Sequence, residues 1–189
     1  LSGFSVILEK TLPYSVLSNM IGAFFMPKSH LIGLITDTHD NKHAIEKAVK
    51  MFKNRDVGLI LHGGDYIAPF NAKWMADVDV PFVGVFGNND GEKFGLRAQF
   101  ESLGPIHRAP YVYEWESKRI LMLHEPDEVD ALAKSGSYDV IFYGHTHQID
   151  IRKGETLVIN PGEACGWTTG RETVGILDLN VMDVEILDL

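Results

Sequence analysis

From Leu31 onward, the apolar residues of this chain fall into short runs that alternate with longer amphipathic segments. Leu31–Thr36 is apolar until its last residue, which is typical of a buried strand. His43–Lys53 instead places Ala44, Ala48 and Phe52 on one helical face. The same criteria predict strands over Val57–Leu61 and Pro81–Phe86, and helices over Pro69–Asp77 and Gly91–Leu103. This alternation of strand and helix predicts right-handed crossovers and a parallel sheet.

The second half of the chain has a different pattern, with many short strand candidates and one clear helix, Asp127–Ser135. The expected strands are Tyr111–Trp115, Lys118–Leu123, Val140–Tyr143, Ile149–Lys153, Thr156–Ile159, Thr173–Leu179 and Val181–Leu187. Two packed sheets with helices outside them would accommodate all of these elements. The sequence therefore predicts an α/β fold in which a two-sheet sandwich is flanked by helices.

The first residues do not fit this pattern. Thr11–Phe25 has apolar residues near helical spacing, but it lacks the basic start and the small-residue cleavage site of a secretory signal. Its apolar run is also interrupted and too short to span a bilayer. Met26 has the features of a natural start just before the first strand. We therefore expect residues 1–25 to be an extension, either translated from an upstream start codon or packed as a helical arm against a second copy, and residues 26–189 to form one domain.

Charge and cysteine content narrow the range of partners and compartments. The formal net charge is −9, whereas a surface that binds a nucleic-acid backbone needs clustered Lys and Arg. Neither a long nucleic acid nor a membrane is therefore expected as a partner. Cys165 is the only cysteine, which excludes an intramolecular disulfide and favours a reducing compartment such as the cytoplasm.

Metal-ligand residue types follow five of the expected strands. Asp37 and His39 come after the first strand and would point the same way if the extended backbone continued. The other candidates are Asp65, Asn88, His124, His145 and His147. In open α/β sheets, ligands bind outside the carboxyl ends of the strands, so the topology alone would bring these side chains together.

Seven oxygen and nitrogen ligands are too many for one tetrahedral zinc ion. They suit two divalent ions that share a bridging carboxylate, with Asp65 as the bridge. Such a site is positive, attracts phosphate, and lowers the pKa of bound water enough to make hydroxide available near neutral pH. Because thiolate is absent from the set, we expect Mn, with Ni, Fe, Zn, Co or Mg as alternatives. The pattern predicts phosphoester hydrolysis by attack of the bridging hydroxide on phosphorus.

The motifs occur in the order DTH (37–39), GGD (63–65), GNND (87–90), a lone His after a strand (124) and GHTH (144–147). In this order they resemble the calcineurin-like metallophosphoesterases, most closely the small single-domain bacterial and archaeal phosphodiesterases. The resemblance covers residues 31–189 and includes a late Asn160-Pro161-Gly162 turn. It implies a four-layer α/β/β/α fold. It also implies one ion on Asp37, His39, Asp65 and His147, and a second on Asp65, Asn88, His124 and His145.

Two positions depart from the family pattern. The family often has GNH followed by an acid, in which the histidine assists the leaving group, whereas Asn89 stands there in this chain and cannot give up a proton at useful pH. Losing a general acid matters most when the leaving group is poor, so we expect slow monoester hydrolysis and faster diester hydrolysis. Glu125 follows His124 where many relatives have glycine, and its carboxylate would narrow the pocket or repel an anionic substrate.

Several neighbouring residues have two interpretations. Asp90 is expected either to hold a ligand histidine or to cap the next helix. His62 would either orient a ligand or pack beside the site. With Asn89, these two are our candidates for a part in catalysis. Three arginines could each bind a phosphate through two hydrogen bonds, with solvated surface as the alternative: Arg97, Arg108 and Arg171. Cys165 is interpreted as a packing residue.

The complete ligand set predicts a metal-dependent phosphodiesterase that acts on a small diester, nucleotide-derived compounds included. The alternative is a non-catalytic interaction scaffold of the same fold, similar to the retromer small subunit. The extension before Met26 would then contact a partner, or a second copy in a homo-oligomer. A scaffold is expected to lose metal ligands, and none is missing from this sequence.

Overall fold

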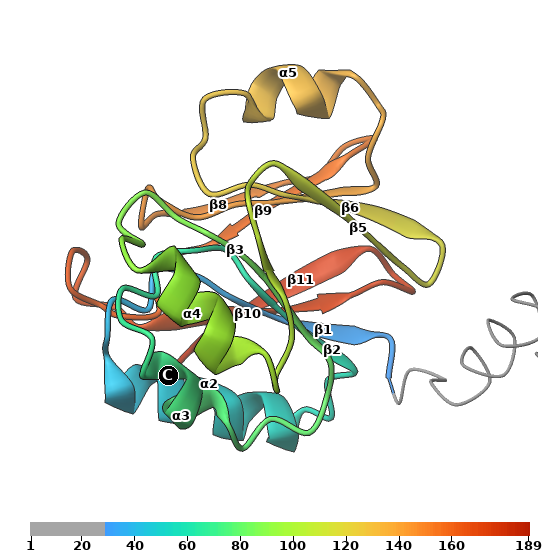
Figure 1. Ribbon diagram of the computed structural model, residues 1–189. Coiled ribbons are helices and arrows are strands. Elements are labelled where there is room, and N and C mark those ends of the chain that lie inside the picture. Colours follow the sequence, from blue (N-terminus) through green and yellow to red (C-terminus); the bar gives the residue numbers. More distant parts are fainter. Residues whose placement is uncertain (1–28) are drawn as a thin grey trace, which may run out of the picture.

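The computed structural model describes residues 29–189, which form two stacked sheets with helices on both outer faces (Figure 1). The expected extension over residues 1–25 lies outside the described residues. The first sheet has the order β11-β10-β1-β2-β3-β4. Its strands are β1 (Leu31–Ile35), β2 (Leu59–His62), β3 (Phe82–Val85), β4 (Ile106–His107), β10 (Thr173–Asp178) and β11 (Asp183–Asp188).

The second sheet has the order β5-β6-β7-β9-β8. Its strands are β5 (Tyr111–Trp115), β6 (Lys118–Met122), β7 (Val140–Phe142), β8 (Ile149–Arg152) and β9 (Leu157–Pro161). The helices are α2 (Lys42–Asn54), α3 (Asn71–Met75), α4 (Lys93–Phe100) and α5 (Val129–Lys134). Strands β1 to β4 are mutually parallel, as are β6, β7 and β9, while β10, β11, β5 and β8 join antiparallel. The parallel first half predicted from the sequence is therefore confirmed.

Three apolar cores hold the four layers together. Alternate residues of β1 pack in two different cores, because successive side chains of a strand point to opposite faces of the sheet. Ile32 and Leu34 pack between the two sheets, whereas Ile35 packs against the α2–α4 layer. Phe52 of α2 lies so close over Gly33 that a Cβ there would be 2.8 Å from its ring. A third core joins the second sheet to α5, on the opposite side of the molecule in Figure 1.

The expected element types are confirmed, and most boundaries lie within about two residues of those expected. Helix α2 begins after Asn41, whose side chain accepts from the backbone N–H of Ala44, as an N-cap does. The sequence did not predict the two-residue strand β4, because so short a segment carries no periodicity. No helix among residues 29–189 combines the length and hydropathy needed to cross a bilayer.

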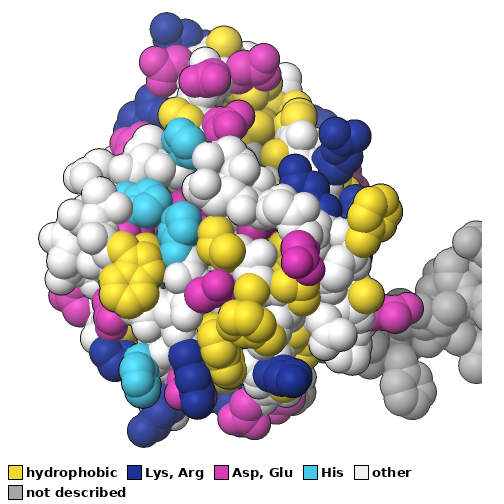
Figure 2. Space-filling view, turned by 60° about the vertical axis from the view of Figure 1, so that its left-hand side comes forward, with side chains coloured by type: hydrophobic (Ala, Val, Ile, Leu, Met, Phe, Trp, Pro, Cys, Tyr) yellow, Lys and Arg dark blue, Asp and Glu magenta, His cyan; other side chains and the backbone are white. Residues whose placement is uncertain are grey.

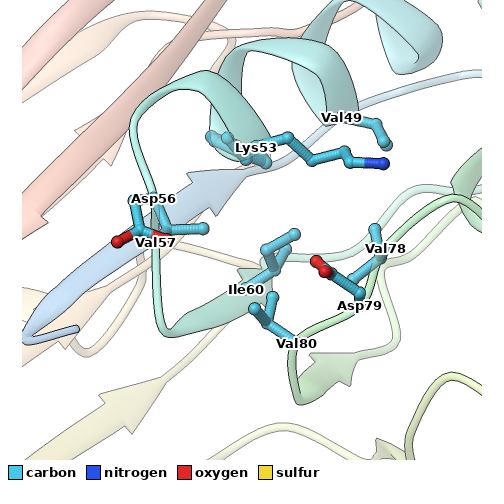
Figure 3. A pocket seen from close by; sticks show the side chains of 9 residues that line it. Val49, Lys53, Asp56, Val57, Ile60, Val78, Asp79 and Val80 are labelled. Atoms are coloured by element: carbon cyan, nitrogen blue, oxygen red, sulfur yellow. The ribbon is translucent and has the colours of Figure 1, made fainter. Parts of the chain in front are cut away.

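A crevice of about 100 Å³ lies between α2 and the loop that precedes β3 (Figure 3). Its wall combines aliphatic side chains such as Val49 and Ile60 with the charged side chains of Lys53, Asp56 and Asp79. Lys53 at its edge donates to Asp77 at 2.9 Å. None of the candidate metal ligands lines this crevice.

Candidate metal centre

All seven candidate ligands lie in loops that follow parallel strands of the two sheets. Asp37 and His39 follow β1, Asp65 follows β2, Asn88 follows β3, His124 follows β6, and His145 and His147 follow β7. The two sheets are stacked, so these carboxyl-terminal loops meet at one side of the sandwich. Figure 2 views a face on which histidine side chains gather beside a large hydrophobic side chain.

The backbone at these loops is not extended, so the condition under which Asp37 and His39 were expected to point the same way is not met. Their φ angles are 52° and 37°, in the left-handed region. The N–H of Asp37 donates to the carbonyl of Gly64 at 3.0 Å, and that of His39 donates to the carbonyl of Asp65 at 3.1 Å. These bonds join the loops after β1 and β2 and offset the cost of the rare conformation, which is about 1–3 kcal/mol per residue.

Four ligand atoms, which we call the first donor set, converge on one point: Asp37 Oδ1, His39 Nε2, His147 Nε2 and Asp65 Oδ2. His147 Nε2 lies 3.4 Å from Asp37 Oδ1. His39 Nε2 lies 3.5 Å from Asp65 Oδ2 and 3.9 Å from Asp37 Oδ1. His39 Nε2 is buried and has no hydrogen-bond partner within the described part of the chain. A buried ring nitrogen that faces two carboxylates and has no hydrogen-bond partner in this part of the chain is the arrangement that a cation would complete.

The second donor set shares Asp65 Oδ2 with the first and adds His124 Nε2, Asn88 Oδ1 and His145 Nδ1. His124 Nε2 lies 3.4 Å from Asp65 Oδ2. Asn88 Oδ1 lies 2.9 Å from both His124 Nε2 and His145 Nδ1. The two sets therefore meet at one carboxylate oxygen, as a bridge between two ions requires.

Other contacts fix the orientation of the donors before any ion is present. Thr36 Oγ1 donates to Asp37 Oδ2 at 2.7 Å, which leaves Oδ1 facing the first set. His124 Nδ1 lies 2.9 Å from the carbonyl of Gly63, so Nε2 faces the second set. A side chain at Gly87 would collide with the Asp65 carboxylate. Glycine at that position is what allows the β3 loop to approach the bridge so closely.

The donor chemistry fits two divalent cations. Carboxylate and amide oxygens with imidazole nitrogens suit first-row ions and magnesium, and the sets combine them without a free thiolate. Burial raises the pKa of Asp65, but hydrogen bonds and charge from His124, with hydrogen bonds from Asn89, outweigh it and hold the pKa well below its usual range. The Asp65 carboxylate, which the two donor sets share, is therefore ionised at neutral pH, as a ligand for cations must be.

Asp90 supports the loops and lies apart from the ligand histidines. It is buried, and its carboxylate accepts from the backbone N–H groups of Asp65, Tyr66, Ile67 and Gly87 at 2.8–3.1 Å. The expectation that it caps the next helix is wrong, because Glu92 occupies that position before α4. Asp90 thus ties the loop that carries the bridge to the loop that carries Asn88.

His62 lies beneath the same loops. It is fully buried and stacks on Tyr66 with ring centroids 3.7 Å apart. Its Nδ1 accepts from the N–H of Gly64 at 3.1 Å, and Nε2 lies 3.3 Å from Thr38 Oγ1. Burial lowers its pKa well below the usual value, so the ring is neutral. Of the two sequence interpretations, the structure favours packing beside the site.

Asn89 contacts the bridge directly. Its backbone N–H donates to Asp65 Oδ1 at 2.9 Å, and its side-chain Nδ2 donates to Asp65 Oδ2 at 2.7 Å. The residue is exposed at the mouth of the site. A neutral amide thus occupies the position at which family members often place a histidine.

The sequence analysis missed Glu163, which is fully buried and holds His147 in place. Its Oε2 lies 2.7 Å from His147 Nδ1, which directs Nε2 toward Asp37. Donors from Thr168 and Thr169 satisfy the rest of the carboxylate. Burial raises the pKa of Glu163, but these donors and the Cys165 thiol bring it to about 2. The one sequence signal near it is the Asn160-Pro161-Gly162 segment, which was expected to be a turn but whose first two residues end β9.

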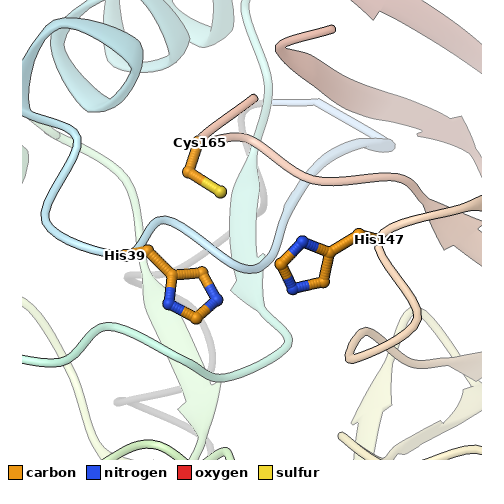
Figure 4. Close-up of side chains that lie close together, drawn as sticks. All are labelled: His39, His147 and Cys165. Carbon is orange, nitrogen blue, oxygen red and sulfur yellow. The ribbon is translucent and has the colours of Figure 1, made fainter. Parts of the chain in front are cut away.

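Cys165 faces His39 and His147 (Figure 4). Its Sγ donates to Glu163 Oε2 at 3.0 Å. Burial and the Glu163 carboxylate raise the pKa of the thiol well above its usual value. The thiol therefore stays protonated and packs against Glu163. Nearby, the exposed Trp167 donates from its indole to the carbonyl of His39 at 3.2 Å.

In two histidines of the site the pKa is raised, so protons would compete with a metal ion for these rings. The hydrogen bond to Asp37, with Glu163 on the other ring nitrogen, raises the pKa of His147 to about 9. Burial lowers the pKa of His124, but the bond and charge of Asp65 outweigh it and raise the value. We therefore expect Mn²⁺ binding at pH 7 to release about one proton from His147 and a further fraction from His124, and affinity to rise with pH until these groups are neutral.

Calorimetric titration in buffers of different ionisation enthalpy measures this proton release. His147→Ala should reduce the number of protons, and His43→Ala, at an exposed histidine on α2, should not change it. Binding of Mn²⁺ without proton release at pH 7 would contradict the account of these two rings.

The comparisons with known proteins identify the family of this chain. The family model for the calcineurin-like phosphoesterase superfamily domain matches residues 31–182. This chain belongs to that superfamily. A phosphodiesterase of Methanocaldococcus jannaschii is 37% identical over 155 residues, which cover 78% of this chain and 92% of the relative. The family resemblance drawn from the motifs is thereby confirmed.

Two solved structures share the fold of this chain. The structure of an archaeal phosphodiesterase is similar, with a TM-score of 0.80 and 33% identity over 84% of this chain and 99% of the other. Vps29 of Chaetomium thermophilum, at 19% identity, has a TM-score of 0.60 over 85% of this chain and 97% of its own. The latter shows the common fold alone. The predicted two-sheet α/β class is confirmed.

Proposed function

We propose that this chain is a binuclear metal-dependent phosphodiesterase whose two donor sets each bind one divalent cation. The observation that carries the proposal is the complete set of seven ligands around the shared oxygen of Asp65. Its membership of a phosphoesterase family with phosphodiesterase relatives supports it. Two ions bound there would supply hydroxide near neutral pH and offset negative charge on a phosphoryl group. The substrate class we propose is a small phosphodiester, nucleotide-derived compounds included.

The side chains around the ions would position the donors. Glu163 fixes the ring of His147, the carbonyl of Gly63 fixes that of His124, and Thr36 fixes the Asp37 carboxylate. Asn89 holds the bridge through two hydrogen bonds. Donors held in this way need no rearrangement when a charged substrate arrives, which favours catalysis.

We propose manganese as the native ion, because the sets offer carboxylate, amide and imidazole and the nearby thiol is protonated. Ni, Fe, Zn, Co and Mg suit the same donors. The single buried cysteine is also why we propose a reducing, cytoplasmic location. Residues 26–189 are the proposed catalytic domain.

The direct test is hydrolysis of bis-p-nitrophenyl phosphate after chelator treatment and after re-addition of Mn²⁺ or Ni²⁺. We expect turnover only with the metal, and faster turnover of diesters than of monoesters. Metal-independent turnover, or none with any ion, would overturn the proposal. A scaffold role is less favoured, because all seven ligand positions are filled and converge.

Asn89→His should restore a proton donor beside the leaving group. We expect turnover of phenyl phosphate, a monoester with a poor leaving group, to rise on the order of 10²-fold, because general acid catalysis contributes about that much. Bis-p-nitrophenyl phosphate, with its good leaving group, should gain far less. Steady-state kinetics on both substrates measure the effect.

Asn89→Ala is the control, because it also removes the amide bond to Asp65 but adds no acid. If the histidine and alanine variants hydrolyse phenyl phosphate at the same rate, position 89 does not control access to monoesters.

A further inference from the structure

A cavity of about 230 Å³ opens directly beside the second donor set. Asn88 and His124 form part of its wall, so an ion bound to the second set would face into it. The same wall carries three exposed charged side chains, Lys93, Arg108 and Glu125. The cavity therefore offers room for one arm of a substrate whose phosphorus lies at the metal centre.

The two cations of this wall, Lys93 and Arg108, have no anionic partner within the part of the chain that the structure describes. Neither Lys93 nor Arg108 forms an ion pair with any residue between 29 and 189. Lys93 lies over the ring of Phe86, with Nζ 5.7 Å from the centroid. By contrast, Arg171 pairs with Asp188, and Arg97 donates from Nε to the carbonyl of Ile106. Among the three arginines that could bind phosphate, Arg108 is therefore the one whose guanidinium has no ion pair or hydrogen bond within residues 29–189.

Glu125 reduces the positive charge of the cavity wall but does not reverse its sign. It offsets one of the two cations, so the three side chains carry a formal charge of about +1 in a protein whose net charge is −9. A neutral arm would gain nothing from Lys93 and Arg108. A planar anionic group, by contrast, can accept two hydrogen bonds from a guanidinium.

We propose that this cavity is an anion subsite, which binds a second negatively charged group, a phosphate or carboxylate, on one arm of the substrate. Arg108 and Lys93 would contact that group, and Glu125 would limit how strongly it binds. The inference rests on the proposed function, because it takes the phosphorus to lie at the two donor sets. It narrows the substrate class to diesters with an additional anionic group on one arm.

Direct binding tests the subsite without relying on turnover. The probes are three-carbon phosphates that differ at the far end: glycerol 3-phosphate is neutral there, 3-phosphoglycerate has a carboxylate, and 1,3-propanediol bisphosphate has a second phosphate. Calorimetry on the full chain, with free Mn²⁺ held constant, gives a Kd for each. We expect at least one anionic probe to bind about tenfold more tightly than glycerol 3-phosphate. Which of the two binds more tightly distinguishes phosphate from carboxylate.

Substitutions then show which side chains cause the difference in Kd between the anionic probes and glycerol 3-phosphate. Arg108→Ala and Lys93→Ala should each bring the ratio of Kd values toward one, whereas Glu125→Gln should increase it. Lys50→Ala, which removes an exposed cation on α2 away from the cavity, should leave the ratio unchanged. A ratio of one in the wild type, or a ratio that Arg108→Ala does not change, would overturn the subsite. If the subsite fails but bis-p-nitrophenyl phosphate is still hydrolysed, the proposed function stands, whereas no hydrolysis by the wild type counts against the function itself.

Discussion

Asp65→Ala is expected to lower the metal-dependent turnover of bis-p-nitrophenyl phosphate by about 10³-fold or more. The reason is geometric, because one oxygen of this carboxylate lies 3.5 Å from His39 Nε2 and 3.4 Å from His124 Nε2. Removing it takes a ligand from both donor sets at once. Steady-state kinetics across a Mn²⁺ series measure the loss, and metal content after dialysis should fall with it.

Two further variants distinguish a loss of turnover caused by the missing ligand from a loss caused by misfolding. Asp65→Asn keeps the volume and one oxygen but removes the charge, so we expect it to be impaired as well, with an unchanged circular dichroism spectrum. Asp127→Ala removes an exposed carboxylate outside the site and should have wild-type activity. Turnover in Asp65→Ala near that of the wild type would rule out a bridging role.

Glu163→Gln has the second largest expected effect. The buried carboxylate holds His147 Nδ1 at 2.7 Å, and the amide keeps the shape but loses the charge that favours this orientation. Residues that orient a ligand histidine typically contribute 10–100-fold to metal affinity. We expect an affinity loss of that size at the first donor set, with the second set much less affected. Calorimetric titration with Mn²⁺ resolves the two binding steps.

Glu114→Gln, at an exposed position on β5, is the matched control and should bind both ions like the wild type. Thermal unfolding of the metal-free proteins shows whether Glu163→Gln weakens the fold itself. Equal Mn²⁺ affinity in Glu163→Gln and the wild type would show that the carboxylate only packs against His147.

The fold was largely predictable because its signals are local. The apolar run of β1 and the amphipathic face of α2 identify the first strand and helix, and the alternation of such elements predicts the parallel order. The ligand positions were predictable for a related reason. Each follows a strand whose carboxyl end faces the same side, so topology brings residues as distant as Asp37 and His147 to 3.4 Å.

The supporting contacts were not predictable, because they depend on how loops meet. Glu163 is one acidic residue in an irregular segment, and no periodicity indicates that it contacts His147. Asp90 could be placed near the site, but its backbone partners after β2 could not be read from spacing. The left-handed backbone at Asp37 is set by hydrogen bonds to the neighbouring loop, which a strand pattern does not contain.

The central claim is that two cations share Asp65, and anomalous diffraction from crystals grown with Mn²⁺ tests it most directly. The account predicts two anomalous peaks about 3.5–4 Å apart. One should lie within reach of His39 and His147, the other within reach of Asn88 and His124, with Asp65 between them. A single peak, or peaks that do not contact Asp65, would contradict it.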